Sequence, residues 1–427
     1  MNFSDSEIVA SILIENNYEL TEKLSDADLL LINTCSIRDN AEKRVRNRLK
    51  EFVSLKIKKP EMVIGIIGCM AERLKEKLFE EEKVVDLIIG PDAYRDLPKL
   101  LTKIESGQKA ANIILSEEET YADIKPVRYG SNGVSAFISI MRGCENFCSY
   151  CVVPYTRGKE RSRNIDSIID EARTLFKDGY SEITLLGQNV NSYRWKKDGR
   201  EYNFTELIEK VALINPLLRV RFTTSHPKDI SDELIETIAR HKNICNSFHL
   251  PVQSGSNSVL KRMNRKYTRE WYLNRIEKIK ELIPDCGLTT DIISGFCGET
   301  ELEHNETISI MKQVGYDFAF MFKYSERPNT AAEKKFKDDV TEEIKKRRLK
   351  EIIEIQQKLS HKSNLRDIGK TFEVLVEGVS KRSSENLSGR NSQNKVVVFP
   401  KRNFKKGDYV NVRIIDCTSA TLIGVSL

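Results

Sequence analysis

Three of the nine cysteines lie within eight residues, at Cys144, Cys148 and Cys151, with CxxxCxxC spacing. Three thiolates at this spacing suit three corners of a cubic 4Fe-4S cluster, and no fourth cysteine follows at ferredoxin spacing to ligate the last iron. An open, electron-rich iron could chelate the amino and carboxylate groups of S-adenosylmethionine and reduce its sulfonium, which releases a 5'-deoxyadenosyl radical. A zinc knuckle is the alternative, but zinc usually needs a second CxxC or a His pair nearby.

The size and composition of the chain limit what surrounds these cysteines. A chain of 427 residues predicts two or three domains. There is no apolar run of about 18 residues and no basic segment followed by an apolar stretch at the N-terminus, which argues against a membrane partner and a secretory signal. Nine cysteines fit reduced thiols and cluster ligands better than a disulfide framework, so we expect a cytoplasmic protein.

The first part of the chain, residues 1–122, alternates expected helices with short apolar strands. Helices are expected at 4–16 and 39–55, and strands at 29–34, 62–67, 87–89 and 112–114. This alternation predicts an α/β fold with a doubly wound parallel sheet. Cys35 and Cys69 each directly follow a strand, and the carboxyl edge of such a sheet would bring the two thiols together.

The central part, residues 134–358, follows a charged and glycine-containing linker and repeats the order strand, loop and helix. Six strands are expected, at 136–141, 182–186, 220–224, 247–251, 287–293 and 317–324. Six such units predict a partial (β/α)6 barrel of parallel strands. The CxxxCxxC loop follows the first strand, at the face where parallel barrels place their active sites.

The tail, residues 362–427, follows a long charged helix expected at 342–362. Short alternating strands at 371–378, 395–399, 409–415 and 420–426 predict a small antiparallel β-barrel. This segment holds 12 Lys and Arg against 6 Asp and Glu, so it carries the whole net charge of +6. A compact basic module on a neutral body indicates a polyanionic partner, with nucleic acid favoured over a solvated face without a partner.

Polar residues follow several of the expected barrel strands and would face one mouth. Gln188 and Asn189 follow the second strand, Ser225 the third, Gln253 the fourth and Arg327 the last. These side chains could contact a cofactor, although turn chemistry is the alternative for Asn189 and a structural ion pair is the alternative for Arg327.

Two groups of basic residues are candidates for contact with nucleic acid. Arg157, Arg161 and Arg163 follow the cysteine loop and could clamp phosphates, or one could pair with a cofactor carboxylate. Candidates in the tail are Lys381, Arg382, Arg390 and Lys395.

These motifs together resemble a known family. The CxxxCxxC segment resembles the radical S-adenosylmethionine motif, which implies that Tyr150 lies beside the adenine of the cofactor. Asn33-Thr34-Cys35, Gly68-Cys69-Met70 and the stretches 153–163 and 185–193 resemble the methylthiotransferase branch, and the tail resembles a TRAM domain. Segments 374–378, 387–390 and 396–399 are most similar to MiaB-type tRNA 2-methylthiotransferases, so the resemblance covers essentially the whole chain.

The resemblance implies that N6-isopentenyladenosine beside the tRNA anticodon is converted to its 2-methylthio derivative, with S-adenosylmethionine as radical source and methyl donor. It implies two 4Fe-4S clusters, a radical cluster and an auxiliary cluster that carries the sulfur and uses Cys35 and Cys69. The implied partners are the tRNA anticodon stem-loop and an electron donor such as flavodoxin or ferredoxin. We expect a monomer.

One departure and three alternatives stay open. The first auxiliary cysteine of the family lies in a Gly-Cys-Gln-Met-Asn stretch whose end matches Met1-Asn2, so we expect the natural protein to begin before Met1. Related methylthiotransferases act on threonylcarbamoyl-adenosine in tRNA or on a ribosomal-protein aspartate. A third alternative, not an enzyme, is an iron-sulfur redox sensor that binds RNA through its tail.

Overall fold

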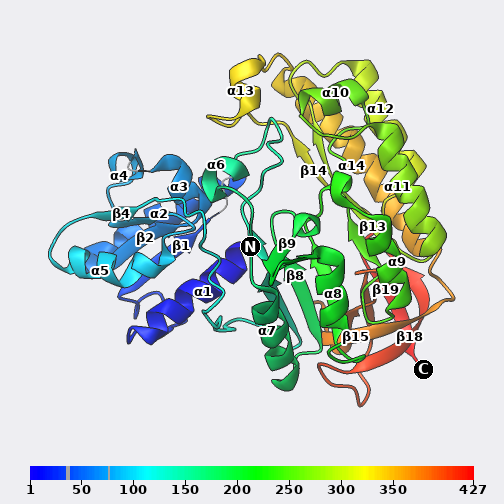
Figure 1. The fold of residues 1–427 in the computed structure, drawn as a ribbon, viewed down its shortest axis with the longest axis horizontal. Coiled ribbons are helices and arrows are strands. Elements are labelled where there is room, and N and C mark those ends of the chain that lie inside the picture. The colour runs from blue at the N-terminus through cyan, green and yellow to red at the C-terminus, as the bar shows by residue number, and fades with distance from the viewer. Residues whose placement is uncertain (35–38, 76) are drawn as a thin grey trace. The chain divides into compact units, whose positions relative to one another are not determined.

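The computed structural model describes residues 1–34, 39–75 and 77–427. They form two compact units. The first contains Met1–Tyr129, Met141–Phe147 and Cys151–Ser167, and the second contains Gly130–Ile140, Cys148–Tyr150 and Ile168–Leu427. Figure 1 shows the chain coloured from blue at the N-terminus to red at the C-terminus.

The first unit contains the predicted parallel sheet. Its strands are β1 (Leu29–Asn33), β2 (Val63–Ile67), β3 (Leu87–Ile89) and β4 (Ala110–Asn112), hydrogen-bonded in that order and all parallel. The last strand lies two residues earlier than the sequence pattern indicates. The α/β prediction for this part of the chain is therefore confirmed.

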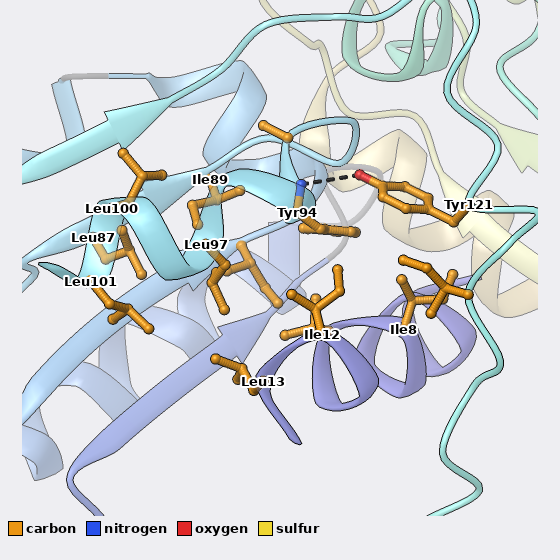
Figure 2. Packing of buried hydrophobic residues seen from close by; sticks show 14 of the residues in the cluster. Ile8, Ile12, Leu13, Leu87, Ile89, Tyr94, Leu97, Leu100, Leu101 and Tyr121 are labelled. Atoms are coloured by element: carbon orange, nitrogen blue, oxygen red, sulfur yellow. Dashed lines mark hydrogen bonds between the residues drawn. The ribbon is translucent and has the colours of Figure 1, made fainter. Parts of the chain in front are cut away.

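Helices cover both faces of this sheet, because apolar side chains of its strands project from both faces. On one face, α1 (Asn2–Glu15), the 3-10 helix η1 (Tyr94–Asp96) and α5 (Leu97–Glu105) enclose one buried cluster, drawn in Figure 2. On the other face, α2 (Asp39–Lys58), α3 (Cys69–Leu74) and α4 (Lys77–Glu81) pack around a second cluster.

The linker after β4 contributes to the first of these clusters. The side chain of Tyr121 is only 2% exposed, and its hydroxyl accepts a hydrogen bond from the backbone N–H of Tyr94 at 3.0 Å, the dashed line in Figure 2. The same hydroxyl donates to the carbonyl oxygen of Pro91 at 3.1 Å. A segment whose composition predicts only a linker thus completes the core beside α1.

The six central strands belong to the second unit and run parallel. They are β5 (Ser135–Ser139), β8 (Glu182–Leu186), β11 (Arg219–Thr223), β12 (Ser247–His249), β13 (Gly287–Ser294) and β14 (Phe318–Lys323). Hydrogen bonds order them as β11-β8-β5 and β12-β13-β14, and the bridge between Val220 and Ile244 links the two halves. The predicted set of six parallel strands is confirmed.

The first of these strands is shorter than predicted. It ends at Ser139, and Met141–Arg142 forms a separate short strand, β6, that pairs antiparallel with β7 (Arg161–Ser162) in the first unit. The prediction of one strand over 136–141 is wrong at its end. A mostly apolar run does not reveal that its first part pairs with β8 and its last part with β7.

Helices follow the central strands in the predicted alternation, and several begin with capping side chains. The helices are α7 (Ile165–Lys177), α8 (Phe204–Ala212), α9 (Asp232–Arg240), α10 (Asn257–Arg262), α11 (Arg269–Leu282), α12 (Glu301–Val314), α13 (Ala331–Lys335) and α14 (Glu342–Leu365). Capping boxes of Asn203 with Glu206 and of Thr300 with Glu303 fix the starts of α8 and α12. In the described part of the chain, no helix combines the length and the apolar character that crossing a membrane requires.

A hairpin and two 3-10 helices interrupt this alternation between β8 and β12. A hairpin of β9 (Arg194–Lys197) and β10 (Arg200–Asn203) precedes α8, and the 3-10 helices η2 (Val190–Ser192) and η3 (Pro227–Asp229) follow β8 and β11.

The tail forms a closed barrel of five strands in the order β15-β16-β17-β19-β18. The strands are β15 (Thr371–Ser380), β16 (Ser383–Arg390), β17 (Val396–Pro400), β18 (Tyr409–Cys417) and β19 (Leu422–Ser426). The predicted barrel is confirmed, although β17 pairs with β19 in parallel and β16 was not expected.

The tail barrel docks on the central strands of the same unit, as Figure 1 shows in red and green. The Tyr409 hydroxyl contacts the carbonyl oxygens of Ser181 and Leu217, each at 2.9 Å. The Arg221 guanidinium donates to the carbonyl oxygen of Asn391 at 2.7 Å. These polar contacts fix the tail barrel on the central strands.

Candidate active site

Cys144 and Cys151 lie in a loop of the first unit that glycine shapes. Gly143 has a φ of +79°, and a Cβ there would lie 1.8 Å from the carbonyl oxygen of Lys159, so no larger residue fits. The Cys144 N–H donates to the carbonyl oxygen of Gly158 at 3.2 Å, and the Val153 N–H donates to the sulfur of Cys151 at 3.5 Å. Neither cysteine forms a disulfide.

Cys148 belongs to the second unit, where its neighbours hold it firmly. The N–H of Ser149 donates to the carbonyl oxygen of Met263 at 2.9 Å, and the carbonyl oxygen of Ser149 accepts from the N–H of Ala332 at 2.7 Å. The sulfur of Cys148 accepts a hydrogen bond from Nη1 of Arg265 at 3.2 Å. This thiol therefore has a buried cation as its direct partner.

Tyr150 packs at the edge of an apolar cluster in the second unit. Its half-buried side chain lies against a group that includes Met263, Phe296 and Tyr324. An aromatic ring held at the edge of an apolar surface is compatible with the predicted contact to an adenine, which stays a prediction.

The carboxyl ends of four central strands carry polar side-chain atoms that are buried without a hydrogen-bond partner among the described residues. They are both amide atoms of Gln188 after β8, Oγ of Ser225 after β11, Oε1 of Gln253 after β12 and Oγ of Ser294 at the end of β13. An unpaired buried polar atom costs about 1–3 kcal/mol, so this set is suited to a polar ligand. Sequence reasoning missed Ser294, which lies one residue beyond the strand predicted at 287–293.

Two residues beside these atoms adopt strained backbone conformations. Thr224 has a φ of +72° and directly follows β11, and Gln253 has a φ of +69° and lies four residues after the end of β12. The left-handed region costs of order 1–3 kcal/mol for such residues and is frequent at functional sites. The strain fixes the directions of Ser225 and Gln253.

The Asn189 side chain has partners inside the protein, and its predicted contact with a cofactor stays a prediction. Its amide nitrogen donates to Asp229 at 2.7 Å, and its amide oxygen accepts from the N–H of His226 at 2.9 Å. The side chain is 1% exposed and ties two loops together. His226 stays neutral because burial, together with the cation of Arg265, lowers its pKa to about 2.

Arg327 is 8% exposed, and its carbonyl oxygen accepts from the Thr330 hydroxyl at 2.8 Å at the start of α13. The predicted role of its guanidinium stays a prediction.

The three arginines after the cysteine loop are buried, and their predicted contact with phosphates stays a prediction. Arg157 and Arg161 are 3% and 6% exposed and form ion pairs with Asp5 at 2.6 Å and with Asp92 at 2.9 Å. Arg163 is also buried and donates to Oγ of Ser167 at 3.0 Å.

Asp5 is the centre of this buried network. It pairs with Arg157 and, at 2.9 Å, with Arg142, which is 1% exposed. Burial alone would raise the pKa of Asp5, but the two guanidinium groups outweigh it and lower the pKa to about 2. Helix α1, strand β6 and helix α6 (Val153–Arg157) are thus tied together by one carboxylate.

Cys69 lies in the same network. It is 6% exposed, begins α3 and accepts a hydrogen bond on its sulfur from Nε of Arg157 at 3.1 Å. Its predicted partner Cys35 lies outside the described residues. Among the residues that the structure describes, no three His, Cys, Asp or Glu side chains converge as metal ligands, so both cluster assignments stand on the cysteine spacing and the family.

The basic residues of the tail fall into two classes. Lys395 forms ion pairs with Asp367 at 2.6 Å and with Asp317 at 3.1 Å, and its predicted contact with nucleic acid stays a prediction. Arg390 is half-buried and pairs with Glu377 at 3.1 Å. Lys381 and Arg382 are exposed in the turn between β15 and β16, where a phosphate backbone could reach them.

Comparisons with known proteins agree with this organisation. Residues 1–90 match the family described as "Uncharacterized protein family UPF0004", residues 138–311 match the "Radical SAM superfamily" and residues 365–427 match the "TRAM domain". The chain is 57% identical to a tRNA-2-methylthio-N(6)-dimethylallyladenosine synthase of Amoebophilus asiaticus, over 99% of this chain and 90% of the relative. It is 58% identical to the protein of that name from Bacteroides fragilis, over 99% and 93%.

The chain belongs to the tRNA-2-methylthio-N(6)-dimethylallyladenosine synthase family. Among solved structures, this family member resembles the radical S-adenosylmethionine methyltransferase TsrM of Kitasatospora setae, with a TM-score of 0.57 and 14% identity over 77% of this chain and 72% of that one. That similarity shows the fold.

Membership of the radical S-adenosylmethionine superfamily implies one 4Fe-4S cluster and S-adenosylmethionine. The donors present in this synthase-family chain fit both groups. Three thiols that form no disulfide suit three irons, and the unpaired atoms of Gln188, Ser225 and Gln253 suit a polar cofactor.

Proposed function

We propose that this chain converts N6-dimethylallyladenosine (N6-isopentenyladenosine) next to the tRNA anticodon to its 2-methylthio derivative. The unpaired polar atoms at the carboxyl ends of the strands carry this proposal, because they provide for a polar cofactor, and the CxxxCxxC segment provides for a cluster. Identity of 57–58% with synthases that bear this activity in their names supports the choice of substrate.

Carbon 2 of an adenine carries a strong C–H bond and no acidic proton, so acid-base chemistry cannot replace that hydrogen. When bound, the radical cluster supplies the electron that cleaves S-adenosylmethionine and makes this bond breakable. Cys144, Cys148 and Cys151 would hold the cluster through their three thiolates, and the cluster would then be able to bind and reduce S-adenosylmethionine. Gln188 and Gln253 pair with polar groups of the cofactor, and Tyr150 lies against its adenine.

An auxiliary cluster is the proposed source of the inserted sulfur, with S-adenosylmethionine as the methyl donor. Cys35 and Cys69 provide two of its thiolates. The buried position of Cys69 and its hydrogen bond from Arg157 support this assignment, since a guanidinium beside the sulfur stabilises a negatively charged ligand set.

The tRNA partner must present one base outside its stack, because a base inside a stacked loop cannot approach a cofactor. Lys381 and Arg382 are the proposed contacts with the phosphate backbone of the anticodon stem-loop, and Arg390 can contribute if it leaves Glu377. We further propose that the enzyme works as a monomer in the cytoplasm, where tRNA is modified, with flavodoxin or ferredoxin as electron donor.

The test is mass spectrometry of nucleosides from tRNA incubated with the reduced enzyme and S-adenosylmethionine. The expected product is the 2-methylthio derivative of dimethylallyladenosine. Methylthiolation of threonylcarbamoyl-adenosine, or of a ribosomal-protein aspartate in a parallel incubation, would assign the chain to one of the related activities instead.

Two measurements, 5'-deoxyadenosine formation and S-adenosylmethionine binding, distinguish an enzyme from an iron-sulfur RNA-binding sensor. Cys148→Ala removes one cluster ligand and is expected to abolish formation of 5'-deoxyadenosine from S-adenosylmethionine. Wild-type amounts of 5'-deoxyadenosine from this variant, with its other cluster loaded, would refute the role of Cys148. Failure of the reduced wild-type protein to bind S-adenosylmethionine would favour the sensor.

A further inference from the structure

Arg265 is a buried cation without a carboxylate partner. The residue is 7% exposed and follows α10 in the second unit. Its Nε donates to the Tyr267 hydroxyl at 3.0 Å, its Nη2 to the carbonyl oxygen of Pro251 at 2.8 Å and its Nη1 to the sulfur of Cys148 at 3.2 Å. Within the described residues, no Asp or Glu forms an ion pair with it.

This arrangement calls for an anion. A buried charge is costly unless an opposite charge compensates it. The neighbours of the guanidinium are a carbonyl oxygen, a phenol and the sulfur of Cys148, and of these the thiol is the group that becomes an anion when it ligates iron.

We propose that Arg265 is a positioning residue that sets the reduction potential of the radical cluster through its hydrogen bond to Cys148. A donor on a ligand sulfur stabilises the reduced, more negative cluster more than the oxidised one, which raises the potential. Arg265 thereby makes the cluster easier to reduce by a protein electron donor. Tyr267 and Pro251 hold the guanidinium in the orientation that this bond requires.

A separate observation in the first unit carries a parallel assignment for Arg157. Its Nη2 is held by Asp5 at 2.6 Å, which leaves Nε to donate to the sulfur of Cys69 at 3.1 Å. We infer that Arg157 sets the potential of the auxiliary cluster in the same way. This second assignment rests on the proposed function, because it requires the auxiliary cluster, whereas the assignment of Arg265 requires only the radical cluster.

The experiment compares Arg265→Gln and Arg157→Gln in the reconstituted full chain by redox titration followed with electron paramagnetic resonance. The radical cluster is identified as the one whose signal changes when S-adenosylmethionine is added. Arg275→Gln is the matched control, since Arg275 pairs with Asp232 and contacts no cysteine. Iron and sulfide contents equal to wild type establish that each variant is loaded.

Arg265→Gln is expected to lower the midpoint potential of the cluster that responds to S-adenosylmethionine and to leave the other cluster unchanged. Arg157→Gln is expected to lower the midpoint potential of the other cluster and to leave that of the responsive cluster unchanged. Arg275→Gln is expected to change neither midpoint potential. An unchanged midpoint of the responsive cluster in Arg265→Gln overturns the assignment of Arg265. An unchanged midpoint of the second cluster in Arg157→Gln, or a wild-type protein without a second cluster, overturns that of Arg157.

Conservative variants keep the assignment of Arg265 testable if Arg265→Gln does not fold. Tyr267→Phe keeps the charge but removes the acceptor of Nε, so a smaller shift in the same direction is expected, and no shift counts against the proposal. Arg265→Lys keeps a cation beside Cys148 and is expected to hold the midpoint potential close to the wild-type value. An enzyme with these shifts that does not methylthiolate tRNA would refute the proposed function and leave Arg265 assigned.

Discussion

Asp5→Asn should destabilise the first unit more than any substitution of a surface carboxylate. Asp5 is fully buried between Arg142 at 2.9 Å and Arg157 at 2.6 Å. Removing one partner of a buried ion pair costs about 3–5 kcal/mol, because the remaining charge stays buried without compensation. Arg142 keeps a contact with Asp92 at 3.5 Å, so the lower end, about 3 kcal/mol, is expected.

The pH dependence of this contribution follows from the pKa of Asp5, which the two guanidinium groups lower from 3.8 to about 2. A lowered pKa in the folded state means that the stabilisation is fully present above pH 3.8. It is lost as the pH falls from 3.8 toward 2, and it amounts to about 2 kcal/mol. The variant should show no such loss from this site.

Hydrogen exchange of the amides in α1 and β6, measured by mass spectrometry at neutral pH, reports this local stability. A loss of about 3 kcal/mol corresponds to exchange roughly 100-fold faster, since about 1.4 kcal/mol is tenfold. The control is Asp26→Asn, which removes an exposed carboxylate in the same unit and should change exchange less than about threefold. An acceleration under about tenfold in Asp5→Asn would refute the argument from the buried charges.

Three further outcomes are expected. Gln188→Ala should weaken binding of S-adenosylmethionine about tenfold in calorimetry, because about 1.4 kcal/mol of hydrogen bonding is lost, and unchanged affinity would exclude the contact. Lys381→Ala with Arg382→Ala should lower tRNA affinity and reduce its log-log salt slope by roughly 2, and an unchanged slope would exclude both contacts. Gly389→Ala should unfold the tail barrel at lower temperature in calorimetry, since its Cβ would lie 2.1 Å from the carbonyl oxygen of Leu375, and an unchanged transition would contradict this.

The sequence predicts the strands of the core well, because their apolar patterns are local. The six central strands and the parallel sheet of the first unit follow from such runs, and α14 follows from its long charged helical pattern. Strand β16 escapes prediction because its sequence, Ser-Ser-Glu-Asn-Leu-Ser-Gly-Arg, is polar and buries mainly Leu387 and Gly389. Its place in the barrel comes from pairing with β15 and β17, and the residues of β16 alone do not predict that pairing.

The candidate site divides in the same way. Cysteine spacing predicts Cys144, Cys148 and Cys151 as cluster ligands, and register at the strand ends predicts Gln188, Ser225 and Gln253 as cofactor contacts. The burial of the arginines after the cysteine loop depends on partners far along the chain, since Arg157 binds a carboxylate 152 positions earlier. The contact of Arg265 could not be predicted for the same reason, because the sulfur that its guanidinium contacts lies 117 positions before it.

The central claim is that this chain removes the hydrogen from carbon 2 of a modified adenine in tRNA by radical chemistry. The most direct measurement uses tRNA whose dimethylallyladenosine carries deuterium at carbon 2, incubated with the reduced enzyme and S-adenosylmethionine. We predict that deuterium appears in 5'-deoxyadenosine while the 2-methylthio product forms. Formation of that product with 5'-deoxyadenosine free of deuterium would contradict the account.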